Sequence, residues 1–410
     1  MAALTADELY TEEYRRAPHD VWERMRHDHP LFRDDVADIW WLTRYDDVAA
    51  VFADHETYSA STYELSTGQV IGPTLISRDD HGHVVRRSIV APDFVGKRLA
   101  SYRDMITDCS DTLIDGFVDA DQFDLVKQFS ARLPVDVISA MLGMSGDGDL
   151  FRQWVTDMIF GLSGSPELRE KGLEAHAQFC SHIAPALQNV DDPARMDHIA
   201  KIARAEVEGH RLDEEEITAF CGLLFIAGGE TTDKAIANMW WNLLRSPELW
   251  QRVCDDRELW DAAFSETMRH SPPVISEDHF TTAPVEWYGT EIPVGARVRV
   301  CMAAAHMDET VFADPRSFQL DRANLHLTKE LRSGGSTEED RSGHLGFGLG
   351  KHFCIGYELA RTEAIIGSHR ILDRCGTDLA FAPGTDPFIT IQGNAFQAVL
   401  DLPLKRSRVS

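Results

Sequence analysis

A long apolar stripe between Asp213 and Arg245 constrains the fold of this chain most strongly. Asp213 and the three glutamates after it are typical of a helix start, where an N-cap and negative charge are both stabilising. The apolar residues then recur at the three- and four-residue spacing of one helix face: Ile217, Phe220, Leu223, Leu224 and Ala227. A helix of about 30 residues is about 45 Å long and must cross the whole molecule. We therefore expect a mainly helical domain built around it.

The remaining pattern agrees with such a domain. Residues 82–251 are predominantly helical in their spacing, and another helix is expected at about 256–270. Residues 30–53 predict a hairpin followed by a helix with Asp46 at its N-cap, and short strands are expected within 285–300 and near 388–393. Residues 56–78 are polar and predict a long loop with a binding role. No repeat or linker divides the chain, so we predict a single domain over 1–410, mainly α with small β-sheets.

Charge and cysteine usage exclude several classes of protein. The formal net charge of −27 is unfavourable for binding nucleic acid, which requires a basic face. The seven cysteines are odd in number and scattered, which argues for a reducing compartment rather than a disulfide framework. The N-terminus is charged where a secretory signal would be apolar, and no uncharged apolar stretch could span a membrane. We expect a cytoplasmic protein that does not bind membranes.

The stretch 344–364, HLGFGLGKHFCIGYELARTEA, carries the clearest chemistry. Its glycines are spaced G-x-G-x-G and follow no strand, which argues against a dinucleotide loop. His344, His352 and Cys354 are not followed by a second Cys/His pair, which argues against zinc. A single cysteine thiolate can instead be the axial ligand of haem iron. A helix start after Cys354 would stabilise the negative charge of its thiolate.

The flanking residues fit that interpretation. Gly348, Gly350 and Gly356 would let the backbone turn tightly and approach a porphyrin. Phe347 would pack beside the sulfur and exclude water, and His352 could pair with a haem propionate. The helical pattern YELARTEAIIGSHRIL follows directly.

On these residues the chain resembles the cytochrome P450 family, the haem-thiolate monooxygenases. The family signature F-[GS]-x-G-x-[HR]-x-C-x-G is matched in full, by Phe347, Gly348, Gly350, His352, Cys354 and Gly356. The resemblance implies heme b, iron protoporphyrin IX, with Cys354 as its axial thiolate. It also implies the P450 fold, a triangular prism with the haem between the long central helix and the helix after Cys354.

The long helix adds a second match. Residues 227–232, AGGETT, fit the family pattern A-G-x-[DE]-T-T. We expect Gly228 and Gly229 to leave room beside the backbone for a ligand or water. Glu230 and Thr231 provide an acid and an alcohol, the components of a proton relay. The resemblance implies that this pair delivers protons to iron-bound dioxygen and that Ala227 lies near the haem.

Three weaker matches occur in the family order. Glu266 and Arg269 fit E-x-x-R, and we expect this pair to brace the segment that contains Phe318 and Arg322. His83 and Arg87 fit H-x-x-x-R, one helical turn apart and able to reach propionates together. His279 lies where many bacterial members have another propionate-binding arginine, and a histidine can still donate a hydrogen bond there.

The resemblance implies an enzyme that inserts one oxygen atom of O₂ into a small, largely apolar organic substrate. No flavin or iron–sulfur segment is recognisable, so a separate ferredoxin or flavodoxin with its reductase must supply the electrons. A basic surface of Lys97, Arg98, Arg103 and Lys351 could bind that carrier. Two alternatives stay open: a peroxide-dependent or non-oxygenating haem-thiolate enzyme, and a non-catalytic haem sensor.

The substrate cannot be identified from the sequence. By family position the pocket draws on residues 61–76 and on apolar side chains at Leu223, Ile226, Val274, Ile275 and Ile391. Such a lining suits terpenoid, steroid, aromatic and polyketide-like compounds equally well.

Overall fold

The computed structural model describes residues 4–162, 165–325, 343–393 and 395–406. It is mainly helical with small sheets, as the sequence predicts. Its contacts divide the chain into two compact units. The first comprises residues 1–62, 234–354 and 384–402, and the second comprises residues 63–233, 355–383 and 403–410.

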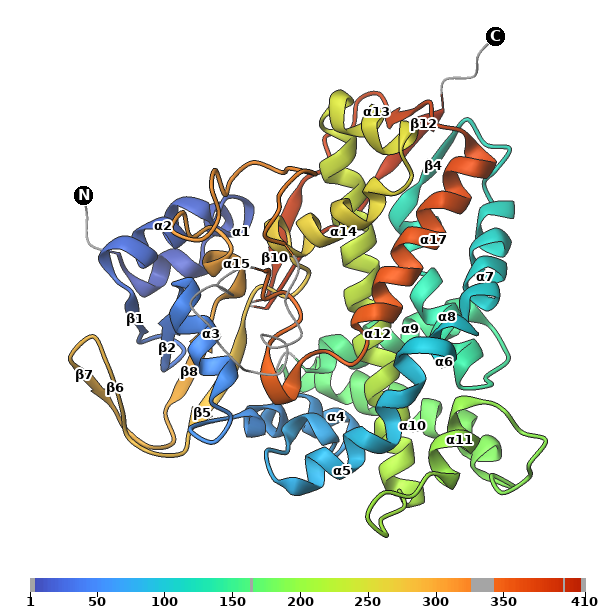
Figure 1. Cartoon of the computed structure of the whole chain (residues 1–410), viewed down its shortest axis with the longest axis horizontal. Helices are drawn as coiled ribbons and strands as arrows, with labels where there is room; N and C mark the ends of the chain where they lie inside the picture. The colour runs from blue at the N-terminus through green and yellow to red at the C-terminus, as the bar shows by residue number, and fades with distance from the viewer. Residues whose placement is uncertain (1–3, 163–164, 326–342, 394, 407–410) are drawn as a thin grey trace. The chain divides into compact units, whose positions relative to one another are not determined.

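The first unit contains a five-stranded sheet in the order β1-β2-β8-β5-β3 (Figure 1). These strands are β1 (Leu31–Asp34), β2 (Ile39–Leu42), β3 (Tyr58–Ser59), β5 (Glu277–Thr281) and β8 (Arg297–Val300). β2 and β8 are parallel, and the other neighbours are antiparallel. Two hairpins complete the unit: β6 (Val285–Trp287) with β7 (Thr290–Ile292), and β10 (Ile389–Gln392) with β11 (Phe396–Val399).

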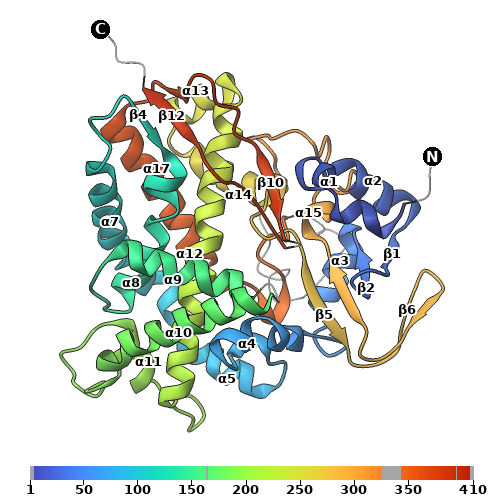
Figure 2. The same cartoon turned by 180° about the vertical axis from the view of Figure 1, so that it is seen from behind.

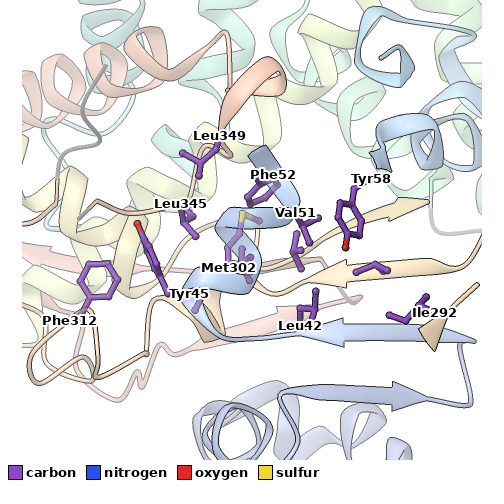
Figure 3. Packing of buried hydrophobic residues seen from close by; sticks show 14 residues of the cluster. Leu42, Tyr45, Val51, Phe52, Tyr58, Ile292, Met302, Phe312, Leu345 and Leu349 are labelled. Carbon is purple, nitrogen blue, oxygen red and sulfur yellow. The ribbon is translucent and has the colours of Figure 1, made fainter. Parts of the chain in front are cut away.

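Also in this unit are the segment that leads to Cys354 and several helices. They are α1 (Glu12–Arg16), α2 (His19–Asp28), α3 (Tyr45–Ala53), α13 (Pro247–Asp255), α14 (Leu259–His270) and α15 (Met302–Ala305), with the 3₁₀ turns η1 (Ala6–Tyr10) and η7 (Gly350–His352). Leu42 and Ile292 from strands pack in one apolar cluster with Phe52 of α3 and with Leu345 and Leu349 (Figure 3). The cysteine segment is therefore part of the core of this unit.

The second unit is dominated by helices, and its one sheet in the described residues is β4-β12-β9. The strands are β4 (Gln122–Asp124), β9 (Leu379–Phe381) and β12 (Pro403–Arg406), all antiparallel. The helices are α4 (Thr67–Ile71), α5 (His81–Val90), α6 (Gly96–Ala100), α7 (Arg103–Asp115), α8 (Leu133–Met141), α9 (Gly148–Gly161), α10 (Pro166–Leu187), α11 (His198–Arg204) and α17 (Tyr357–Cys375). Shorter turns are η3 (Leu75–Ser77), η4 (Ala91–Phe94) and the π-helical turn η5 (Val126–Ser130).

The expected long helix is α12 (Glu214–Leu244), which has 31 residues. Asp213 accepts the backbone N–H of Glu216 at 2.8 Å, and the Glu216 carboxylate accepts the N–H of Asp213 at 3.2 Å. This reciprocal pair of bonds is a capping box, and it fixes where the helix begins. Within the second unit, α9 and α10 run as an antiparallel pair (Figure 2).

Two local predictions were wrong. The helix that we expected Asp46 to cap is α3, and it begins instead at Tyr45. The backbone N–H of Tyr45 donates to the Asp308 carboxylate at 3.1 Å. Residues 56–78 do not form a plain loop, because they contain β3, the 3₁₀ turn η2 (Ala60–Leu65), α4 and η3. Val70, Ile71 and Leu75 are buried there, and this apolar burial stabilises the short helices.

Candidate active site

The backbone around Cys354 folds into a tight, hydrogen-bonded loop. The N–H of Cys354 donates to the carbonyl oxygen of Phe347 at 2.9 Å, and the N–H of Phe353 donates to that of Gly350 at 3.1 Å. Cys354 is half-buried, and α17 begins three residues later at Tyr357. The thiol therefore lies on a fixed loop just before a 19-residue helix.

Two glycines of the loop are required for the backbone conformation and one is required for space. Gly348 and Gly350 have φ values of +68° and +64°, the left-handed region that glycine adopts without strain. Gly346 is required for space, because a Cβ there would lie 2.7 Å from the carbonyl oxygen of Met268. Gly356 caps α17, and its carbonyl oxygen accepts the N–H of Ala360 at 2.9 Å. The close approach at Gly346 was missed from the sequence, since nothing local indicates that α14 comes so near.

None of the seven cysteines, which all lie within the described ranges, forms a disulfide bond. Burial raises the pKa of six of these thiols: Cys109, Cys180, Cys221, Cys254, Cys301 and Cys375. Those six are protonated structural residues at neutral pH. Cys354 is the one of the seven that lies in the glycine-rich loop before α17.

Aromatic rings surround the start of the loop. The ring of Phe347 stacks on Phe264 of α14, with centroids 6.2 Å apart, and contacts His344 with centroids 5.8 Å apart. On β5, His279 is buried and meets Phe52 of α3 edge to face, with centroids 5.8 Å apart. The first unit therefore brings Phe347 and His279 into apolar surroundings, although on different elements.

Glu266 and Arg269 of α14 form a fully buried pair with two bonds of 2.7 and 2.8 Å. Arg269 also donates to the carbonyl oxygens of Pro315 and Ser317, and Glu266 accepts the N–H of Gln319 at 3.0 Å. The Arg322 guanidinium lies 3.3 Å from the same carboxylate. The pair thus holds the 315–322 segment, and no charge in this network is left without a partner.

In the second unit, α5 carries His83 and Arg87 one turn apart. His83 is buried, and its backbone N–H donates to the carboxylate of Asp80, the N-cap of α5, at 3.2 Å. Between the two, Arg86 is paired with Glu216 at the start of α12. The position of α5 is therefore set by a cap at its N-terminus and by an ion pair to α12.

The centre of α12 combines a polar pair with an open surface. The hydroxyl of Thr231 donates to the carbonyl oxygen of Ala227 at 2.7 Å. Ala227 is exposed, although Phe225 and Ile226 just before it are buried. The helix therefore presents accessible backbone and a small side chain at Ala227, while Glu230 beside Thr231 is half-buried.

The expected room at Gly228 and Gly229 is filled by protein. A Cβ at Gly228 would lie 3.2 Å from Ile138 of α8, and a Cβ at Gly229 would lie 3.2 Å from Val135 and Val155. These glycines let α8 and α9 pack closely on α12. The prediction that they leave space for a ligand was wrong, because a sequence does not indicate which face of a glycine a neighbour occupies.

The proposed substrate residues lie in different surroundings. Leu223 and Ile226 are buried on α12, and Val274 is half-buried beside a bridge to Phe396. Ile275 and Ile391 are members of a closed apolar cluster with residues such as Trp22 and Phe32. Of the three proposed substrate residues in the first unit, Val274 therefore has the most accessible side chain.

These residues fit a haem group. The Cys354 thiol forms no disulfide and lies on a glycine-rich loop before a helix, and Ala227 offers an accessible apolar surface on α12. Among the described residues no three His, Cys, Asp or Glu side chains are grouped to hold a metal ion, so Cys354 belongs to no such group. A single protein ligand would suit an iron that a porphyrin already binds through its ring nitrogens. None of the described helices has the length and hydropathy to cross a lipid bilayer.

Comparison with known proteins points to one family. The family model described as cytochrome P450 matches residues 168–393. A steroid C26-monooxygenase from Mycolicibacterium smegmatis is 30% identical over 87% of this chain and 84% of its own length. The monooxygenase PikC from Streptomyces venezuelae is 29% identical over 97% of this chain and 93% of its own length. The structure of CYP109E1 from Bacillus megaterium in complex with corticosterone has a TM-score of 0.84 at 26% identity, covering 96% of this chain and 99% of that one.

Proposed function

This chain belongs to the cytochrome P450 family and is a monooxygenase, and from that premise we propose that the Cys354 thiolate is the axial ligand of a heme b. The observation that carries the proposal is the loop itself. The Cys354 N–H is bonded to the Phe347 carbonyl oxygen, while two left-handed glycines turn the chain between them. When bound, the haem supplies the iron at which O₂ is activated, and a thiolate ligand favours cleavage of the O–O bond.

The chain's own residues hold the thiolate and keep water away from it. The Cys354 N–H is already engaged, so the loop cannot swing without breaking that bond. Phe347 stacks on Phe264 and gives the loop an apolar side, and Gly348 and Gly356 shape the turn and the start of α17. A dry, low-dielectric surrounding strengthens the interaction of a thiolate with a metal.

We assign the haem propionates to basic side chains. His83 and Arg87 on α5, His279 on β5 and His352 in η7 would donate to these carboxylates. The capping carboxylate of Asp80 and the pair between Arg86 and Glu216 support α5 in this task. We also propose that Ala227, which is exposed on α12, lies beside the porphyrin.

Glu230 and Thr231 are the proposed proton-handling pair. The Thr231 hydroxyl donates its hydrogen to the Ala227 carbonyl oxygen, so its Oγ1 remains an acceptor. That oxygen can receive a hydrogen bond from a water or from a protonated oxygen at the site. Glu230, one residue earlier and half-buried, would exchange protons with solvent.

The substrate is an organic molecule, and we propose a small, largely apolar one. Leu223 and Ile226 of α12 and the half-buried Val274 would contact it, and Ile275 and Ile391, which lie in a buried apolar cluster, are further proposed substrate residues. Apolar contacts orient such a substrate and exclude water. One named relative acts on steroids and one similar structure holds corticosterone, so steroids belong in the first panel of compounds.

P450 monooxygenases receive electrons from a redox partner, and here we propose a separate ferredoxin or flavodoxin with its reductase. Lys97, Arg98 and Arg103 are exposed in the second unit, and Lys351 lies in η7. Arg98 is also bonded to Asp93 at 2.9 Å, so part of its charge is already neutralised. Lys97→Glu with Lys351→Glu should slow reduction by a ferredoxin without changing substrate affinity. A control variant, Lys171→Glu on α10, should leave reduction unchanged; equal rates in all three proteins would contradict the docking surface.

Two broader proposals rest on the chain itself. The chain passes between the two units several times, which supports one P450 domain over 1–410 rather than two independent ones. Cysteines that form no disulfide bonds support a cytoplasmic location.

The experiment that tests the function is turnover with a defined electron source. The purified enzyme, supplied with a ferredoxin, its reductase and O₂, should oxygenate a compound that shifts its Soret band. Isotopically labelled O₂ should place one labelled atom in the product. Product that forms only with added peroxide would point to a peroxide-dependent enzyme instead.

A further inference from the structure

His306 makes a hydrogen bond that connects it to the Cys354 loop. It lies directly after α15 and is fully buried, and its Nε2 accepts the backbone N–H of Leu345 at 2.7 Å. Leu345 is fully buried as well and packs in the apolar cluster around Phe52 and Met302 (Figure 3). The bond therefore joins two segments inside the core, far apart in the sequence.

This bond fixes the chemical state of the imidazole. A ring nitrogen that accepts a hydrogen bond carries no proton, so His306 must be neutral with its hydrogen on Nδ1. Burial, together with electrostatic interactions with His344 and Arg269, lowers the pKa of His306 well below its usual range. The ring also meets His344 and Phe312 edge to face, with centroids 6.4 and 6.2 Å away, which fixes its plane.

From Leu345 a short series of backbone bonds leads to the cysteine. The carbonyl oxygen of Leu345 accepts the N–H of Gly348 at 2.9 Å, which closes the turn containing Phe347. The carbonyl oxygen of Phe347 in turn accepts the N–H of Cys354 at 2.9 Å. A shift of Leu345 would therefore move the group that holds the Cys354 amide.

The other side of His306 is held by the buried ion pair. Its carbonyl oxygen accepts a bond from the Arg269 guanidinium at 3.1 Å, and Arg269 is paired with Glu266. A second anchor acts just before Leu345, where the Tyr45 hydroxyl donates to the carbonyl oxygen of Gly343 at 2.7 Å. His306 thus links the Glu266–Arg269 pair to the loop: its backbone carbonyl oxygen bonds Arg269, and its side chain bonds Leu345.

We propose that His306 is a positioning residue for the Cys354 loop: its neutral imidazole accepts the Leu345 amide and holds the loop in the conformation that presents the cysteine sulfur to the haem iron. The inference rests on the assignment of Cys354 as the ligand. The hydrogen bond between His306 and Leu345 does not depend on that assignment. The bond and the assignment can therefore be tested separately.

The test compares His306→Leu with His306→Gln in the haem-loaded protein. Leucine keeps the bulk and removes the acceptor, which leaves a buried N–H without a partner, whereas the glutamine oxygen can accept the same bond. Hydrogen exchange should become about tenfold faster over residues 343–354 in the leucine variant and stay within about twofold of wild type in the glutamine variant. The fraction of ferrous carbon monoxide complex with thiolate-type absorption should fall in the leucine variant and be restored in the glutamine variant.

A matched control separates loop positioning from general damage. His198 is also fully buried and bonded, to Asp93 at 2.7 Å, so His198→Leu removes a comparable buried bond from the second unit. It should lower Tm while leaving exchange over 343–354 unchanged. Unchanged exchange in His306→Leu, no rescue by glutamine, or an equal effect of His198→Leu would each overturn the proposal. A wild-type protein without thiolate-type absorption would refute the Cys354 assignment, and exchange would still decide whether His306 holds the loop.

Discussion

The hydroxyl of Thr231 donates to the carbonyl oxygen of Ala227 at 2.7 Å, one turn earlier in α12. The bond occupies the hydroxyl hydrogen and leaves the oxygen free to accept another. The bond also fixes the direction of the hydroxyl group. It does so beside Ala227, which is exposed on the helix. An alcohol held in this way can receive a hydrogen bond in a constant direction and stabilise a protonated oxygen beside the helix.

Thr231→Ala removes that acceptor and should divert electrons from product. We expect the yield of oxygenated product per electron to fall by at least about tenfold and hydrogen peroxide to increase correspondingly. Thr231→Ser keeps the hydroxyl and should retain most of the coupling. Parallel measurement of electron consumption, product and peroxide checks this, and a tightly coupled Thr231→Ala enzyme would exclude a proton-handling function for Thr231.

The Glu266–Arg269 pair should be among the most sensitive positions for stability. Glu266→Ala leaves the buried guanidinium of Arg269 without its carboxylate and should lower the free energy of unfolding by about 3–5 kcal/mol. The solvent-accessible pair of Arg252 and Asp321 is the control, and Arg252→Ala should cost much less stability. Denaturant unfolding of both variants tests the difference; equal losses would mean that burial of the first pair has no special effect.

Gly346 should not tolerate any side chain. The Cβ of Gly346→Ala would lie 2.7 Å from the Met268 carbonyl oxygen, so either α14 or the loop must shift. We expect a loss of about 1–3 kcal/mol in stability and a lower haem content. Gly68→Ala in α4 meets its nearest neighbour at 3.5 Å and should be tolerated. Haem content per protein and Tm check both variants, and full haem content in Gly346→Ala would contradict the close approach.

Asp136 should make stability depend on pH. Burial raises the pKa of its carboxyl to about 6 from the ordinary 3.8, and Asp149 adds to the rise while Arg132 opposes it. The native state therefore keeps this proton to higher pH than the unfolded state does. The protonated Asp136 carboxyl therefore contributes its full stabilisation of the native state below about pH 4. This contribution is lost as pH rises toward about 6 to 7.

Asp136→Asn cannot ionise, so it should become more stabilising relative to wild type as pH rises. Between pH 5 and pH 7.5 its advantage should grow by about 1 kcal/mol. The exposed Asp378→Asn serves as the control and should show no such trend. Denaturant unfolding at the two pH values measures it, and a constant difference between Asp136→Asn and wild type would refute the burial effect.

The elements that the sequence predicted are those with strong local signals. The length and cap of α12 follow from its apolar stripe and from Asp213, and the turn at Cys354 follows from glycines that have positive φ. Each of these two signals depends on residues that are near neighbours in the sequence. Periodicity and residue type are therefore enough to predict them.

What the sequence could not give depends on partners far away in the chain. Asp308, rather than the nearby Asp46, bonds the first N–H of α3, and Met268 is the neighbour that requires glycine at 346. The acceptor of the Leu345 amide, His306, is equally remote. A local pattern indicates that an amide needs an acceptor, but only the fold decides which side chain arrives there.

The most direct measurement is the absorption spectrum of the reduced carbon monoxide complex of the wild-type protein and of Cys354→Ser. The account predicts thiolate-type absorption for wild type and its complete loss in Cys354→Ser. A matched variant of a buried thiol, Cys301→Ser, should keep it. Thiolate-type absorption that persists in Cys354→Ser, or a wild-type protein that binds no haem when the cofactor is supplied, would contradict the central claim.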